Sequence, residues 1–213
     1  MTLLVQSKEM ACGLDPLHLV QNLHGAVPVN LYALVGYIPA PLSDFLDGLR
    51  AQLVPDCRLR SHVSLLPPRP LNGPIAGALE QIQNLAGRTP SFRIELGNIE
   101  VFDETSVIYV GLACGSDELE RIHGILNDDC LSYAEPFCYH PHITLAQKFR
   151  AEELPRLRVI AINAWRGYEG PRSFDVDTIT FVQNRLLPGV DGNGVQRSDW
   201  VDLAECSMAD RIG

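Results

Sequence analysis

Apolar runs and amphipathic segments alternate along most of this chain. Residues 29–39 form a mostly apolar run that ends at a proline, which is typical of a buried strand. In residues 40–53 the apolar positions recur every three or four residues, which predicts a helix with one apolar face. Further strands are expected at 58–66, 91–102, 107–113, 142–146, 174–182 and 199–203, and further helices at 74–86, 116–127 and 151–165.

Two local features refine these boundaries. Pro67 and Pro68 are expected to stop the strand 58–66, because proline has no backbone N–H to donate to a neighbouring strand. In the strand 91–102 the alternation of apolar and polar residues changes phase at Gly97, which predicts a β-bulge at that position.

The order of the expected elements favours an α+β architecture, in which helices pack on antiparallel or mixed sheets. A unit of strand, helix, strand, helix and two strands occurs nearly twice. We therefore expect two pseudo-symmetric β-sheet lobes with outer helices and a central groove. Residues 1–27 follow no regular pattern and are interpreted as an N-terminal arm, which leaves residues 28–213 as a single bilobal domain.

The repeat places two similar tetrapeptides on the second strand of each unit. Residues 62–65 read His-Val-Ser-Leu, and residues 142–145, 80 positions further on, read His-Ile-Thr-Leu. Because residues i and i+2 of a strand point the same way, His62 and Ser64 share one face, and the histidine and threonine of the second motif do likewise. If the two units pack around an approximate two-fold axis, two imidazoles and two hydroxyls face each other across a cleft.

This set of side chains suits phosphodiester chemistry. One group must activate the attacking oxygen and another must protonate the leaving oxygen, and histidine performs either role near neutral pH. His62 and His142 are the candidate catalytic residues. Ser64 and Thr144 would donate hydrogen bonds to the non-bridging phosphate oxygens without a metal ion. Which histidine is the acid and which is the base depends on the orientation of the substrate and stays open.

The paired motifs resemble those of the 2H phosphoesterase superfamily, which includes 2′,5′ RNA ligase-like proteins and cyclic phosphodiesterases. The flanks, "HVSLLPPRPL" and "YHPHITLA", are similar to the two motifs of that family, and the resemblance extends from about Val29 to the end. It implies a bilobal fold with a central groove, no metal or other cofactor, and hydrolysis or formation of 2′,3′-cyclic phosphates or 2′–5′ linkages. Many relatives carry Arg where this chain has Gln147, and Lys148 is the candidate to supply positive charge to the phosphate.

Other interpretations of these residues stay open. The same cleft without chemistry would be a module that binds an RNA end or a nucleotide. Cys138, His140 and His142 lie at i, i+2 and i+4 and would suit zinc, but Pro141 interrupts their strand and the first motif would be unexplained. His140 is more simply an exposed edge residue.

Two further kinds of residue could assist a nucleotide site. Arg60 shares the face of His62 and could steer a phosphate, although a solvated arginine is the simpler interpretation. Trp165, Tyr168 and Phe149 could stack on a base, although aromatic residues of this sort are more often part of a core.

Composition narrows the class of partner. The net charge of −9, from 17 basic and 26 acidic side chains, argues against binding to long duplex nucleic acid, so a small nucleotide or an RNA terminus is the expected substrate. The six cysteines include no Cys-x-x-Cys pair and are interpreted as reduced thiols. Neither an apolar run of about 18 residues nor an export signal is present, and we expect a cytoplasmic monomer.

Overall fold

The computed structural model describes residues 30–55, 57, 59–190 and 196–210, so the predicted arm 1–27 lies outside the described residues. The strands are β1 (Leu31–Tyr37), β2 (His62–Arg69), β3 (Phe92–Phe102), β4 (Val107–Cys114), β5 (Ile143–Ala146), β6 (Ser173–Val176), β7 (Thr178–Val190) and β8 (Gln196–Ser207). The helices are α2 (Leu42–Leu53), α3 (Ile75–Ala86), α4 (Ser116–Leu126) and α5 (Leu154–Arg166), with short 3-10 turns η1 (Asp129–Leu131) and η2 (Ala151–Glu153).

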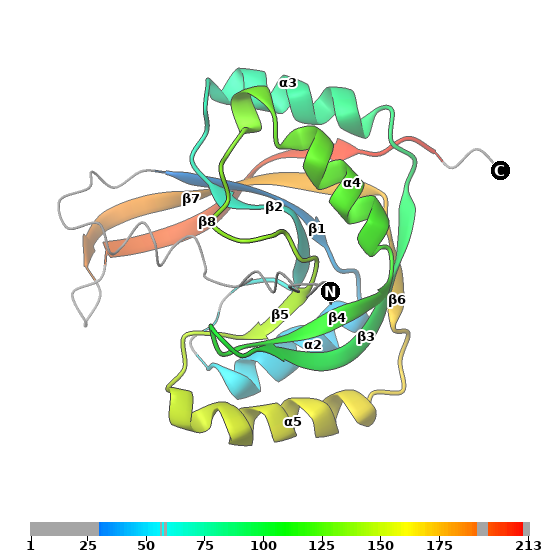
Figure 1. The fold of residues 1–213 in the computed structure, drawn as a ribbon, viewed down its shortest axis with the longest axis vertical. Helices are drawn as coiled ribbons and strands as arrows, with labels where there is room; N and C mark the ends of the chain where they lie inside the picture. Colours follow the sequence, from blue (N-terminus) through cyan, green and yellow to red (C-terminus); the bar gives the residue numbers. More distant parts are fainter. Residues whose placement is uncertain (1–29, 56, 58, 191–195, 211–213) are drawn as a thin grey trace, which may run out of the picture.

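The strands form two antiparallel sheets of four strands each, which confirms the predicted α+β fold with two sheet lobes (Figure 1). The first sheet has the order β2-β1-β7-β8 and the second has the order β5-β4-β3-β6. Each predicted motif therefore lies at the edge strand of its own sheet, on β2 in the first and at the start of β5 in the second.

The helices are exchanged between the two halves of the chain. Helix α2, from the first half, packs against β5 of the second sheet together with α5, whereas α4, from the second half, packs against β2 with α3 beside it (Figure 1). Each motif strand is thus supported by a helix that belongs to the other half. Among the described residues, no helix is long and apolar enough to cross a membrane.

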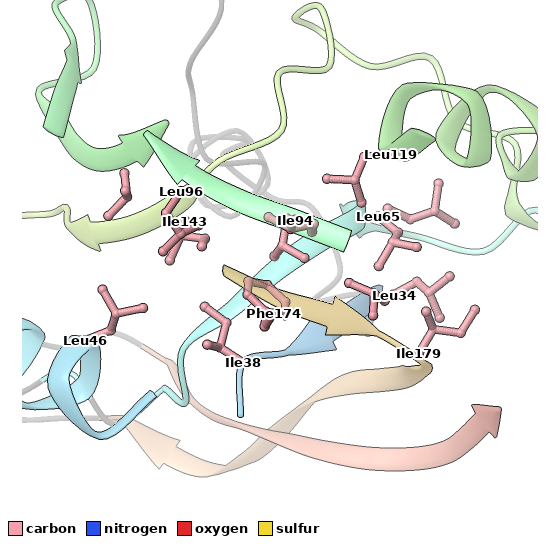
Figure 2. Close-up of a cluster of buried hydrophobic side chains, with 14 of the residues drawn as sticks. Leu34, Ile38, Leu46, Leu65, Ile94, Leu96, Leu119, Ile143, Phe174 and Ile179 are labelled. Carbon is pink, nitrogen blue, oxygen red and sulfur yellow. The ribbon is translucent and has the colours of Figure 1, made fainter. Parts of the chain in front are cut away.

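A continuous core joins the two lobes. Leu65 of β2 packs near Leu119 of α4, and Ile143 of β5 packs towards Leu46 of α2 (Figure 2). All four side chains are at most 1% exposed. The apolar residues that alternate with the motif residues are therefore the ones that anchor both motif strands, which fixes the motif side chains on the opposite face.

The predicted end of the second strand is wrong. Strand β2 continues through Pro67 and Pro68 to Arg69 instead of stopping before the prolines. The reason is that β2 is an edge strand with a neighbour on one side only, so a residue without an N–H is tolerated there.

The prediction of one strand over 174–182 is also wrong. The segment contains two strands, and the chain passes at Asp177 from β6 in the second sheet to β7 in the first. Both strands are apolar with similar alternation, so the sequence pattern continues across the crossover. The predicted irregularity at Gly97 is confirmed, because the pairing of β3 with β4 shifts register between Leu96 and Ile99.

Candidate active site

A pocket of about 570 Å³ is lined by residues from both sheets and contains both predicted motifs. His62 and Ser64 reach it from β2, and His142 and Thr144 reach it from β5 and the residue before it. All four side chains are partly buried. The structure therefore brings together the four residues that the repeat singles out in separate halves of the chain.

The two motif histidines are held in the same way. Nδ1 of His62 donates a 2.7 Å hydrogen bond to the carbonyl of Arg60, and Nδ1 of His142 donates a 2.7 Å hydrogen bond to the carbonyl of His140. In both motifs the acceptor lies two residues earlier. A carbonyl oxygen only accepts, so each neutral ring carries its proton on Nδ1 and its lone pair on Nε2. The Nε2 atoms are the ones left for proton transfer.

Burial keeps both imidazoles neutral near pH 7. It is the main reason why the pKa of His62 falls to about 4 and the pKa of His142 falls to about 4, against the opposing effect of the two carbonyl hydrogen bonds. The charge of Arg50 lowers the pKa of His62 further, and the charges of His140 and His62 lower the pKa of His142. A charge on His62 therefore makes protonation of His142 less favourable.

Aromatic rings surround His142. Phe102 and Tyr109 stack with their ring centroids 4.1 Å apart, and the ring of His142 meets them at steep angles, with centroid distances of 5.0 and 5.1 Å. The side chain of His140 is exposed, and its ring contacts the same pair at 5.3 and 5.8 Å. These contacts fix the plane of the His142 ring and remove water from one side of it.

A polar cluster lies beside His62. The Tyr37 ring meets the His62 ring at right angles with centroids 6.4 Å apart, and its hydroxyl donates a 2.7 Å hydrogen bond to Asp202. The guanidinium of Arg60 lies 3.7 Å above the Tyr37 ring and 3.7 Å from the Asp202 carboxylate. Arg60, for which the sequence favours a solvated position over a role in steering phosphate, thus forms part of the pocket wall.

The loop that precedes the second motif is tied to the strand that carries the first. Tyr139 donates a 2.6 Å hydrogen bond to the carbonyl of Ser64, and its ring stacks on His123 with centroids 4.0 Å apart. Nε2 of His123 lies 3.2 Å from the carboxylate of Glu135, which also pairs with the buried Arg69 of β2. The loop is therefore attached to β2 at two points.

Gln147 and Lys148 follow β5 and lie in different surroundings. Gln147 is partly buried and lines the pocket, whereas Lys148 is exposed and is not among the residues that line it. Lys148 adopts a left-handed backbone conformation with φ of 60°, which turns the chain at the end of the strand. Its role in phosphate binding stays a prediction.

The described residues contain no group of three or more His, Cys, Asp and Glu side chains arranged to hold a metal ion. This includes Cys138, His140 and His142, whose spacing suggested zinc. The rings of His140 and His142 are 6.3 Å apart, and Nδ1 of His142 is already used in its hydrogen bond to a backbone carbonyl.

Several residues of the pocket wall carry no signal in the sequence pattern. Tyr37, Phe102, Glu135, Trp200 and Asp202 line the pocket from segments far apart in the chain. These residues come together only when the strands pair. Tyr37, for example, lies directly opposite His62 between β1 and β2.

The aromatic candidates from the sequence lie elsewhere. Trp165 is buried in the core and stacks on Tyr168, and Phe149 packs against the same core. None of the three is among the residues that line the pocket.

The α+β fold with two sheet lobes, and the pocket that contains both motif histidines, agree with the resemblance to the 2H phosphoesterases found in the sequence. Residues 38–186 match the sequence profile of the 2'-5' RNA ligase superfamily, so the chain belongs to this family, and the resemblance to the 2H phosphoesterases is confirmed. No match was found among the curated proteins.

Solved structures share the fold. E. coli LigT complexed with 3'-AMP is 18% identical, with a TM-score of 0.56 over 86% of this chain and 100% of LigT. A phosphoesterase structure is 19% identical with a TM-score of 0.54, over 85% of this chain and 99% of that one. A protein of Thermus thermophilus is 15% identical with a TM-score of 0.54, again over 85% and 99%.

Proposed function

We propose that this protein is a metal-independent phosphodiesterase that acts on 2′,3′-cyclic phosphates or on 2′–5′ linked RNA or nucleotides. The observation that carries the proposal is the matched orientation of His62 and His142, each with Nδ1 bonded to a carbonyl two residues earlier, in one pocket. E. coli LigT has been crystallised with 3'-AMP, ATP and NADP+, and the family membership supports a nucleotide substrate here.

In the proposed mechanism the histidines share one proton. The neutral histidine uses the lone pair of Nε2 to take a proton from water or from a ribose hydroxyl as that oxygen attacks phosphorus. The other histidine, protonated on Nε2, gives its proton to the leaving oxygen. Ser64 and Thr144 donate hydrogen bonds to the phosphate oxygens, where negative charge grows in the transition state. Either histidine fits either role, according to how the substrate lies.

A substrate panel tests the proposal. The protein is incubated with nucleoside 2′,3′-cyclic phosphates and with 2′–5′ and 3′–5′ dinucleotides, with and without a chelator, and the products are separated by chromatography. Turnover of a cyclic phosphate or a 2′–5′ dinucleotide that survives the chelator is expected. Absence of turnover on every substrate, or activity that is lost with chelator and restored by zinc, contradicts the proposal.

A binding module of the same fold is the second candidate. The observation in its favour is Gln147, a neutral residue in the pocket at the position where the resemblance to the family implies arginine. Binding of a nucleotide that survives conversion of both His62 and His142 to alanine, in a wild-type protein without turnover, selects this candidate over the enzyme.

A further inference from the structure

Part of the pocket surface beside His62 is apolar and takes no part in the proposed chemistry; we call it the apolar floor. The floor is a small cluster, separate from the main core, made of Ala33, Val35 and Val182. Tyr37 and Trp200 are the partly buried hydrophobic residues packed against it among the described residues. Ala33, Val35 and both aromatic residues also line the pocket, so this cluster is part of the pocket wall.

Strand pairing explains why these side chains gather there. Residues directly opposite one another in a sheet share a face, and Tyr37 lies opposite His62 while Val182 lies opposite Asp202. The neighbouring residues Leu34 and Leu65 point to the other face, where they join the main core (Figure 2). The face that carries His62 is therefore the pocket face, and its apolar floor stands next to the site of chemistry.

At the edge of the apolar floor, neighbouring side chains hold the planar guanidinium of Arg60 in place. Asp202 accepts a hydrogen bond from the Tyr37 hydroxyl and pairs with Arg60, so one carboxylate fixes both side chains. One face of the Arg60 guanidinium is stacked on Tyr37, and the Arg60 side chain is still 64% exposed. Its outer face is thus open for a second flat group. Guanidinium planes and aromatic rings are the surfaces on which unpaired bases stack.

We propose that Arg60, Tyr37 and Trp200 form a nucleobase subsite on the His62 side of the pocket. This inference rests on the proposed function, and it narrows the substrate class. Phe102, which meets the ring of His142, also lines the pocket and offers an aromatic surface on the His142 side. Aromatic surfaces on both sides of the histidines suit a substrate with a nucleoside on each side of its phosphate. A 2′–5′ linked dinucleotide has this form, whereas a nucleoside 2′,3′-cyclic phosphate carries one base.

Tryptophan fluorescence tests the subsite without any need for turnover. The chain has two tryptophans, and Trp165 is buried in the core, so Trp200 is the one that a bound base can reach. Adenylyl-(2′–5′)-adenosine is expected to quench the emission of the wild-type protein and not that of Trp200→Phe. Ribose 5-phosphate, which has no base, is expected to leave both unchanged. Equal quenching in Trp200→Phe, or calorimetric binding of the dinucleotide without quenching, overturns the subsite.

Kinetics separate the subsite from the chemistry. Arg60→Ala keeps the backbone carbonyl that orients His62 and removes the stacked guanidinium together with its pairing to Asp202. We expect the ratio of kcat/KM for the dinucleotide to kcat/KM for a 2′,3′-cyclic phosphate to fall roughly tenfold. Arg93→Ala is the matched control, because Arg93 forms a similar exposed pair with Asp175 on the second sheet, outside the residues that line the pocket.

The outcomes distinguish the two proposals. An unchanged ratio in Arg60→Ala, in a wild-type enzyme that turns over both substrates, overturns the subsite and leaves the proposed function standing. A wild-type protein without turnover contradicts the proposed function, and the fluorescence titration then decides the subsite by itself.

Discussion

The hydroxyl of Tyr139 donates a 2.6 Å hydrogen bond to the carbonyl of Ser64, which joins the segment before the second motif to the middle of the first. The two residues are 75 positions apart in the chain. Because Tyr139 lies three residues before His142, and Ser64 two residues after His62, this bond spans the two halves of the candidate site. It therefore links the position of one histidine to that of the other.

Tyr139→Phe removes this bond and keeps the ring stacked on His123. We expect a loss of about 1 kcal/mol in the free energy of unfolding, measured by urea denaturation, and a fall of roughly tenfold in kcat as the two motifs lose alignment. Tyr168→Phe is the control, because the Tyr168 hydroxyl is buried without a hydrogen-bond partner among the described residues. A Tyr139→Phe variant with wild-type kcat would show that the bond does not align the site.

Gln147→Arg introduces a positive charge into the pocket at the end of β5. We expect tighter binding of phosphate, seen as a several-fold lower inhibition constant for inorganic phosphate that rises again with added salt. Lys148→Gln, measured in parallel, tests the phosphate role predicted for Lys148. A loss of phosphate affinity in Lys148→Gln, with no gain in Gln147→Arg, would favour Lys148 as the source of charge.

The pH dependence of activity follows from the lowered pKa values of the two histidines. A pair with pKa values of about 4 carries a single shared proton mostly at acidic pH. The pH profile of kcat/KM, which reports the free enzyme, should peak below about pH 6 and fall towards alkaline pH. A bound phosphodiester anion stabilises the imidazolium, so the profile of kcat should lie at higher pH. A kcat/KM maximum above about pH 7.5 would contradict this.

The stability of the folded protein at acidic pH depends on His123. Burial is the main cause that lowers its pKa to about 4, and the charge of Arg69 adds to it. An unfolded histidine titrates near 6.5, so between about pH 6.5 and pH 4 the unfolded chain binds more protons than the folded one. The stability that this group contributes is complete above about pH 6.5 and is lost as the pH falls, by up to about 1.4 kcal/mol per pH unit. Urea midpoints across this range should decline less steeply in His123→Gln, and an equal slope would contradict the assignment.

Much of the fold was predictable because its signals are local. One strand buries the face that carries Val63 and Leu65, and one helix buries the face that carries Leu42 and Leu46. The spacing of these apolar residues in the sequence shows which face is buried. The crossover at Asp177 was not predictable, since strands of two different sheets follow each other with the same alternation. The strand end predicted at Pro67 and Pro68 was wrong for a related reason. Only the pairing of the strands shows that β2 is an edge strand.

The candidate site was also predictable only in part. The two histidines and two hydroxyls were identifiable because a repeat in the sequence places them at equivalent positions. The contacts that orient them depend on neighbours in space: Tyr139 reaches Ser64 across the site, and Asp202 of β8 approaches Arg60 only because β7 brings β8 into the same sheet. No spacing rule connects such pairs.

The most direct test of the central claim is a double-variant comparison of His62 and His142. Steady-state rates on the preferred substrate are measured, in the presence of a chelator, for His62→Ala, for His142→Ala and for the protein with both changes. If the two form one acid–base pair, each single change costs about two to four powers of ten, and the double variant is about as slow as the slower single one. Wild-type rates in either single variant, or losses that multiply fully in the double variant, would contradict a pair that acts as a unit.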